Sequence, residues 1–315
     1  MRIYIDYPFL ENLFLSDSSE DVIYRIKRLI SDPGSPASLI LNFDHLSLYG
    51  DAEKEVIVRQ IAQKLPEVVP NFESKLTDRE FYDTHEPLLF FCDSDIPKTH
   101  EFGCLTLKSK NIELAKRLLY YEELSINNSY RDWSVLKHFK LPINSLVITD
   151  NYFLQNDKSL ENLKMILLSL MPSSLKIVFD LTIIGYSAKD FVNLATQFEN
   201  ISQFLKANYS YSVNLSIVRE DFHARNIFTN YTRFDTDKGF GLFENGRIKP
   251  RNYTTLKHVS YTDFGIRSKV YDLVKSDLEK GRKIAGVNRL KEREIGSKTN
   301  RLFPQKPQTF PPVNT

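Results

Sequence analysis

Short β-rich runs alternate with amphipathic helical runs along most of the 315-residue chain, and this alternation limits the folds that are open to it. Residues 39–43 and 145–150 are typical of buried strands. Between such runs lie helical patterns, for example the one that places Val22, Ile26 and Ile30 on a single face. The order of strand, helix and strand predicts an α/β fold with mixed, mainly parallel sheets flanked by helices.

Changes in this pattern divide the chain into three parts. Residues 1–130 are expected to form a small α/β domain of unknown role, and residues 140–285 a second α/β domain. Residues 286–315 are basic and rich in proline, a composition typical of an extended tail. The basic residues between positions 282 and 301 are either a nucleic-acid contact or a solvated helix end, and the interspersed Glu292 and Glu294 favour the second.

Composition excludes several classes of protein. Apolar residues make up 42% of the chain and aromatic residues 12%, which argues against disorder. The 42 basic and 40 acidic residues leave a net charge of only +2, so a nucleic-acid contact has to come from local charge. Neither Cys92 nor Cys104 lies in a CxxC pair or near a histidine cluster, so a disulfide stays open but no zinc is predicted.

The chain lacks the features of a membrane or nucleotide-hydrolysing protein. Its start has no basic head or long apolar core of a signal peptide. The most apolar helical run, residues 165–171, is far shorter than the roughly 20 residues that a bilayer requires. The expectation is a cytoplasmic protein without a membrane span. No Walker-type glycine loop occurs, and neither a metal nor a cofactor is predicted.

The candidate catalytic residues begin a single stretch of the second domain, FHARNIFTNYTRFDTDKGFGLF at residues 222–243. His223 and Arg225 are two residues apart, so on an extended strand their side chains would point to the same side. A histidine can act as nucleophile or as acid–base group near neutral pH, and a guanidinium offers a fork of donors that fits a phosphate. The pair predicts a phosphate-handling pocket.

Further polar and glycine candidates follow in the same stretch. Asn230 is the next polar candidate, and it is expected to help Arg225 hold the phosphate. Gly239 and Gly241 would let backbone amides approach an anion closely, and Lys238 adds a cation beside them.

This spacing resembles the phospholipase D superfamily signature, in which HxK precedes an Asp and a Gly-rich turn. It is more similar to the branch marked by His-Asp-Arg, an Asn and Gly-x-Gly. That branch includes the C-terminal domain of MIT-containing ESCRT proteins and bacterial relatives from phage-defence loci. The resemblance covers residues 146–264 and implies a phospholipase D-like second domain, with a phosphodiesterase or nuclease role in antiphage defence.

Three positions depart from the superfamily pattern. Arg225 stands in the Lys slot and Asn230 in the Asp slot, and some members of the His-Asp-Arg branch bind membranes without catalysis. Ala224 stands where that branch has Asp, either as a natural departure or as an engineered substitution that silences the protein. The resemblance therefore leaves both a catalytic and a binding role open.

The chain contains only one convincing copy of the motif. Residues 138–140 also read HxK, but Ser145 falls in the Asp slot and no glycine turn follows, as in a chance match. Phospholipase D enzymes use two motifs, so the resemblance implies a homodimer if the chain is catalytic.

Carboxylates at strand ends are further candidates. Asp150 and Asp180 each follow a β-rich run, and side chains at the carboxyl ends of parallel strands often line active sites. Asp6 ends the first strand in the same way. The alternative is that these residues form turns or cap helices.

Three hypotheses for function follow. The first is a phosphodiesterase of nuclease type in prokaryotic defence. The second is a non-catalytic module that binds a phosphate, a nucleotide or a nucleic-acid end in the same pocket. The third is an assembly subunit whose tail docks on a protein partner from the same defence locus.

Overall fold

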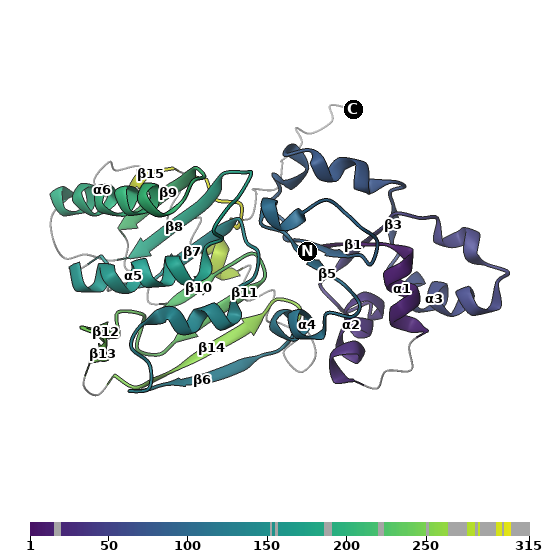
Figure 1. Ribbon diagram of the computed structural model, residues 1–315, viewed down its shortest axis with the longest axis horizontal. Helices are drawn as coiled ribbons and strands as arrows, with labels where there is room; N and C mark the ends of the chain where they lie inside the picture. Colours follow the sequence, from purple (N-terminus) through teal and green to yellow (C-terminus); the bar gives the residue numbers. More distant parts are fainter. Residues whose placement is uncertain are drawn as a thin grey trace, which may run out of the picture.

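Two β-sheets, one in each half of the chain, organise the protein (Figure 1). The computed structural model describes residues 1–15, 20–151, 153–154, 157–185, 191–219, 224–249, 252–263, 276–280, 283, 294–297 and 299–303. Within these ranges, no helix is long and apolar enough to cross a membrane.

The first sheet has five strands in the order β3-β2-β1-β4-β5, and every pairing in it is parallel. Its strands are β1 (Arg2–Ile5), β2 (Ser38–Leu41), β3 (Glu67–Val68), β4 (Leu88–Phe91) and β5 (Leu105–Leu107). The helices of this half are α1 (Tyr7–Phe14), α2 (Asp21–Ser31), α3 (Ala52–Ala62) and α4 (Ile112–Leu119).

Alternation along β1 shows how this sheet is covered. Ile3 and Ile5 pack into the same apolar cluster as the buried faces of α1 to α4. Tyr4 points the other way, into a cluster that includes Phe72 and Phe102. Phe72 lies in the short 3-10 helix η2 (Phe72–Thr77) and Phe102 in η4 (Thr99–Phe102). A third 3-10 helix, η3 (Glu80–Tyr82), adds Tyr82 to the same cluster. Both faces of the sheet are therefore buried, as a parallel sheet requires.

The second sheet has eight strands in the order β15-β9-β8-β7-β10-β11-β14-β6. Its strands are β6 (Glu122–Ile126), β7 (Ser145–Thr149), β8 (Phe179–Gly185), β9 (Val213–Arg219), β10 (Asn226–Phe228), β11 (Thr232–Thr236), β14 (Thr254–Ser260) and β15 (Glu294–Gly296). Only the β7–β8 and β8–β9 pairs are parallel, and the remaining pairs are antiparallel.

Two long helices, α5 (Asp157–Leu170) and α6 (Phe191–Asn208), lie side by side over the parallel centre of this sheet (Figure 1). The remaining elements are the 3-10 helices η1 (His45–Leu48) and η5 (Trp133–Phe139) and the hairpin of β12 (Phe243–Glu244) and β13 (Arg247–Ile248). The predicted α/β class is confirmed. The strands β10, β11 and β14, which follow one another without an α-helix between them, pair antiparallel.

The two halves are packed together through specific contacts. The hydroxyl of Tyr231 accepts a hydrogen bond from the Leu105 N–H and donates one to the Leu88 carbonyl, both at 2.9 Å. Gly103 lies so close to the chain at Ile143 that a Cβ would stand 2.5 Å from that carbonyl. In addition, β6 lies within the range that the sequence assigns to the first domain, yet it pairs with β14 in the second sheet.

Part of the region expected to form an extended tail joins the second sheet. Strand β15 pairs with β9, and the buried amide of Asn300 donates to the Leu146 carbonyl and to Thr182 Oγ1, both at 3.1 Å. Arg301 forms ion pairs with Asp83 and Asp180 at 3.0 and 3.1 Å. A basic, proline-rich composition does not reveal these contacts of Asn300 and Arg301, because each joins residues more than 100 positions apart.

Candidate functional site

The start of β10 lies at the carboxyl end of β7. Asn226 pairs with Thr149, and the Asn226 N–H donates to Thr149 Oγ1 at 3.0 Å. Arg225 directly precedes this pair and so lies at the carboxyl edge of the parallel strands. His223 lies outside the described residues, so its position relative to Arg225 stays a prediction.

Asp150 is the first residue after β7, and its side chain is completely buried. Its backbone N–H donates to the Ile184 carbonyl at 3.0 Å, which holds it beside the end of β8. Its carboxylate accepts a hydrogen bond from the Phe240 N–H in the predicted glycine turn. A backbone amide of the turn thus approaches an anion, as the sequence suggests, and this anion is the carboxylate of Asp150.

Gly239 is the residue that allows this approach. Its φ of +78° favours glycine, and a Cβ there would stand 2.8 Å from Asp150 Oδ2 and 3.2 Å from Arg225 Cδ. The Gly239 carbonyl accepts from Thr236 Oγ1 at 2.9 Å, so the end of β11 holds the turn. The structure therefore brings Asp150, Arg225 and Gly239 into contact, although they are distant in sequence.

The arginine is fixed at the rim of this cluster. Its guanidinium donates to the Asp237 carbonyl, one residue before Lys238. A hydrogen bond from Thr254 lowers the pKa of the Asp237 carboxyl, so this carboxylate stays charged. Lys238 is exposed beside it. The rim therefore holds two cations and one carboxylate at its exposed edge.

The rest of the glycine turn is held by backbone contacts. Trp133 Nε1 donates to the Phe240 carbonyl at 2.7 Å, and Lys249 Nζ donates to the Gly241 carbonyl at 2.9 Å. Gly241 is therefore positioned by its carbonyl.

Ala224 is half-buried. Its methyl group packs against an apolar cluster that includes Val147, Ile184 and Val218. This cluster lies on the opposite face of the sheet from α5 and α6, whose apolar residues belong to a different cluster.

Asn230 is placed at the other end of β10 from Arg225. Its side-chain oxygen accepts from the N–H groups of Asn144 and Ser145 at 3.0 and 3.2 Å, and its amide donates to Asn144 Oδ1 at 2.9 Å. These bonds fix the start of β7. The structure does not bring Asn230 together with Arg225, because four residues of extended chain separate them.

Asp180 is also at the amino edge of the sheet. The sequence places it at the end of a strand, but β8 begins at Phe179 and Asp180 pairs with Ser145. Burial raises the pKa of Asp180, and Arg301 opposes that shift through an ion pair. In the sequence, a charged residue within a β-rich run looks like the end of a strand. The sequence does not show that Asp180 has an ion-pair partner, because Arg301 lies 121 positions away.

The second HxK match has a structural role. Residues 138–140 lie at the end of η5, where exposed His138 Nε2 is 3.6 Å from Glu122 Oε2 and Phe139 is buried. Both cysteines are buried and free, so the disulfide that the sequence leaves open is not formed.

The contact between Asp150 and Gly239 is the feature that sequence reasoning did not connect. Asp150 and the glycine turn are each recognisable, but their meeting depends on the antiparallel order β7-β10-β11. The short spacing between β10 and β11 is the signal for that hairpin.

Comparison with known proteins adds little to this site. No family model and no curated protein matches the sequence. Among solved structures, the crystal structure of phosphatidylserine synthase from Haemophilus influenzae Rd KW20 is similar at 12% identity and a TM-score of 0.30, over 65% of this chain. The match spans about half of that synthase, 48% of its chain. A likeness at this level does not assign the chain to a family.

Proposed function

We propose that the protein binds phosphodiesters at the carboxyl edge of β7 and cleaves them as a nuclease does. The observation that carries this proposal is the contact of Asp150, Arg225 and Gly239 at one edge of the sheet. It joins a cation that fits a phosphate to a glycine turn locked by a buried carboxylate. Ligands of open α/β sheets bind at this edge.

Each residue then has a distinct role. Arg225 binds the phosphate oxygens, and Asp150 is a positioning residue that holds the turn against Arg225. His223 acts as nucleophile or as acid–base group. As nucleophile, its ring nitrogen bonds to phosphorus while the bond to the leaving oxygen breaks and that oxygen takes a proton; water then cleaves the N–P bond. A second copy of the chain would supply the second histidine, so catalysis requires a homodimer.

Cleavage assays test this proposal directly. Ala224→Asp is incubated with single- and double-stranded DNA and RNA, with and without divalent metal. We expect metal-independent cleavage that the additional change His223→Ala abolishes. Because Ala224 packs against apolar side chains, a melting curve must first show that Ala224→Asp is folded. Cleavage that persists in His223→Ala would contradict the assigned site.

A non-catalytic binding role is the second candidate, and the environment of Ala224 favours it. The methyl group offers no acid or base, and it contacts an apolar cluster. In that case the unmodified protein binds nucleic acid in a salt-sensitive manner without turnover. Salt-insensitive binding, or turnover by the unmodified chain, would exclude this role.

The biological setting is part of the proposal and has its own tests. The resemblance implies cytoplasmic antiphage defence, so the gene should lie beside genes for other defence proteins. An assembly role through the tail is tested by deleting residues 304–315, which spares β15 and the contacts of Arg301. Loss of a complex with a neighbouring gene product would support that role.

A further inference from the structure

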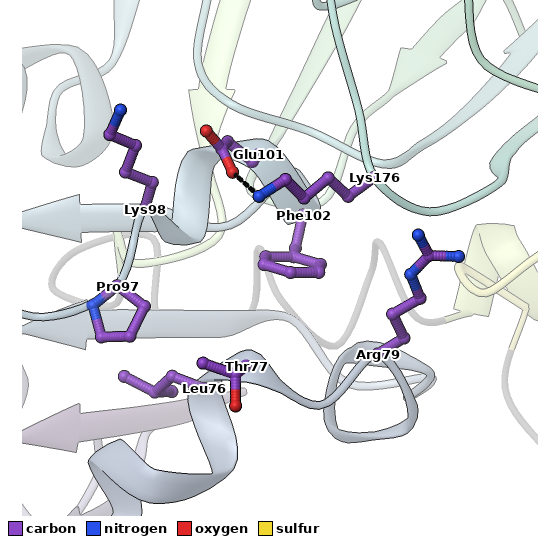
Figure 2. A pocket seen from close by; sticks show the side chains of 8 residues that line it. All are labelled: Leu76, Thr77, Arg79, Pro97, Lys98, Glu101, Phe102 and Lys176. Atoms are coloured by element: carbon purple, nitrogen blue, oxygen red, sulfur yellow. Dashed lines mark ion pairs between the residues drawn. The ribbon is translucent and has the colours of Figure 1, made fainter.

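A cavity of about 590 Å³ lies where the two halves of the chain meet (Figure 2). It is lined by Leu76, Thr77, Arg79, Pro97, Lys98, Glu101, Phe102 and Lys176. All but Lys176 belong to the 3-10 helical layer of the first half, and Lys176 comes from the segment between α5 and β8. A bound molecule would therefore touch both halves.

The charges around this cavity are unbalanced. Arg79, Lys98 and Lys176 are cationic, and Glu101 is the one carboxylate among the lining residues. Lys176 Nζ forms an ion pair with Glu101 Oε2 at 2.5 Å, and the Lys176 N–H donates to the Glu101 carbonyl at 2.7 Å. Arg79 and Lys98 are exposed and form no ion pair with a described residue. Besides Lys176, Lys98 also helps to lower the pKa of Glu101 and lies on the other side of Phe102 from Arg79 (Figure 2), so Arg79 is the cation that remains available for an anion near Lys176.

The opposite wall is apolar. Leu76 and Phe102 are buried side chains of the first half, and Pro97 lies beside them. The Phe102 ring stacks on Tyr82 with 4.2 Å between the centroids and an angle of 3° between the planes. Lys176 Nζ lies 6.0 Å from the centre of the Phe102 ring. Figure 2 shows the Phe102 ring between the Lys176–Glu101 pair and Leu76.

We propose that this cavity binds a nucleoside phosphate. The phosphate lies against Arg79 and Lys176, which lie on the same side of Phe102 in Figure 2, because guanidinium and ammonium groups form charge-assisted hydrogen bonds with its oxygens. The base packs toward Leu76, Pro97 and Phe102. The volume falls within the range of roughly 300–1,000 Å³ that is typical of small-molecule sites. The site is separate from the Arg225 cluster and does not depend on cleavage there.

Calorimetric titration of the full chain tests this proposal with AMP, adenosine and inorganic phosphate as probes. We expect AMP to bind at least about tenfold more tightly than adenosine or inorganic phosphate. Adenosine contacts only the apolar wall of the cavity, and phosphate contacts only its cations. Equal affinity for inorganic phosphate and AMP would overturn the nucleoside assignment, and absence of AMP binding at millimolar concentration would overturn the site. A 5′-phosphorylated dinucleotide distinguishes the source: tighter binding than AMP assigns a nucleic-acid end, weaker binding a free nucleotide.

Variants of the lining residues locate the binding. Arg79→Ala should weaken AMP binding about tenfold, the effect of one lost charge-assisted hydrogen bond. Lys75→Ala is the matched control, because Lys75 is an exposed cation of the neighbouring 3-10 helix, η2, and does not line the cavity. Unchanged affinity in Arg79→Ala would overturn the assignment.

Glu101→Gln should have the opposite effect on AMP affinity. Removing this carboxylate frees Lys176 for the phosphate, so AMP binding should tighten severalfold. A merely structural Glu101 would instead give weaker or unchanged binding, which contradicts the proposed charge arrangement. His223→Ala should leave AMP binding unchanged, so failure of the nuclease proposal and failure of this one are separable. Loss of AMP binding in His223→Ala would place the nucleotide in the other site and overturn the inference.

Discussion

The two sheets each end a strand with a completely buried aspartate, and the two carboxylates are used differently. Asp6 follows β1 and Asp150 follows β7. Asp6 accepts three backbone N–H groups, from Phe9 at 2.9 Å, Asp93 at 3.1 Å and Ser94 at 2.8 Å. It caps α1 and ties the end of β4 to β1, so its carboxylate is occupied by the backbone of its own half.

Asp150 accepts from the Phe240 N–H in the glycine turn, and Gly239 holds it beside Arg225. The comparison teaches that an aspartate at the end of a strand is not by itself a sign of a functional site. What distinguishes Asp150 from Asp6 is the glycine turn that it binds, which lies against Arg225. Predictions at Asp6 and at Gly239 can break or sharpen this distinction, and a third, at His258, probes the second sheet itself.

Replacement of Asp6 has the largest expected effect on stability. Asp6→Ala leaves three N–H groups without their acceptor and should lower the free energy of unfolding by about 4 kcal/mol. Asp6→Asn keeps one acceptor oxygen and should cost about half as much. Urea unfolding measures both changes. If Asp6→Ala is as stable as the unmodified protein, Asp6 does not hold the backbone at this end of β1 in place.

Acid should reveal a weakness of the second sheet. His258 packs against the rings of Phe139 and Phe234, which also contact each other, and its buried Nε2 has no hydrogen-bond partner among the described residues. Burial, with a smaller contribution from His138, lowers its pKa from 6.5 to about 4. The unfolded chain therefore takes up this proton first, and stability is lost as the pH falls from 6.5 toward 4, by about 3 kcal/mol in total.

The His258 prediction requires a control because neighbouring groups also titrate. His138 and Glu122 lie on the adjoining elements, and Glu122 pairs with His258 in the register of β6 and β14. His258→Phe keeps these neighbours and should remove the acid-dependent loss between pH 6.5 and 4. An identical pH profile in His258→Phe and the unmodified protein would show that other groups cause it.

The glycine turn gives the smallest of the three effects on stability. Gly239→Ala meets Asp150 Oδ2 at 2.8 Å and should cost about 2 kcal/mol more than Gly246→Ala. Gly246 is the matched control, since its φ of +70° is similar but nothing lies within 4 Å of its Cβ position. Equal losses in thermal unfolding of the two variants would mean that Asp150 does not press against the turn.

The sequence predicts the α/β class and the strands at both sheet centres, because periodicity and turn residues are local signals. It also singles out Asp150 correctly as a residue at a strand end. It does not reveal that Asn230 fastens Asn144, or that Asp180 lies within β8 and pairs with Arg301. Those roles depend on partners 86 and 121 residues away, and single-sequence patterns carry no information at that distance.

The central claim is that Arg225 binds phosphate at the edge of the second sheet, and fluorescence anisotropy with a labelled single-stranded oligonucleotide tests it most directly. Arg225→Ala should weaken binding about tenfold and reduce the slope of log affinity against log salt by about one, whereas the exposed-arginine control Arg59→Ala should change neither. An unchanged dissociation constant and salt slope in Arg225→Ala would contradict the account.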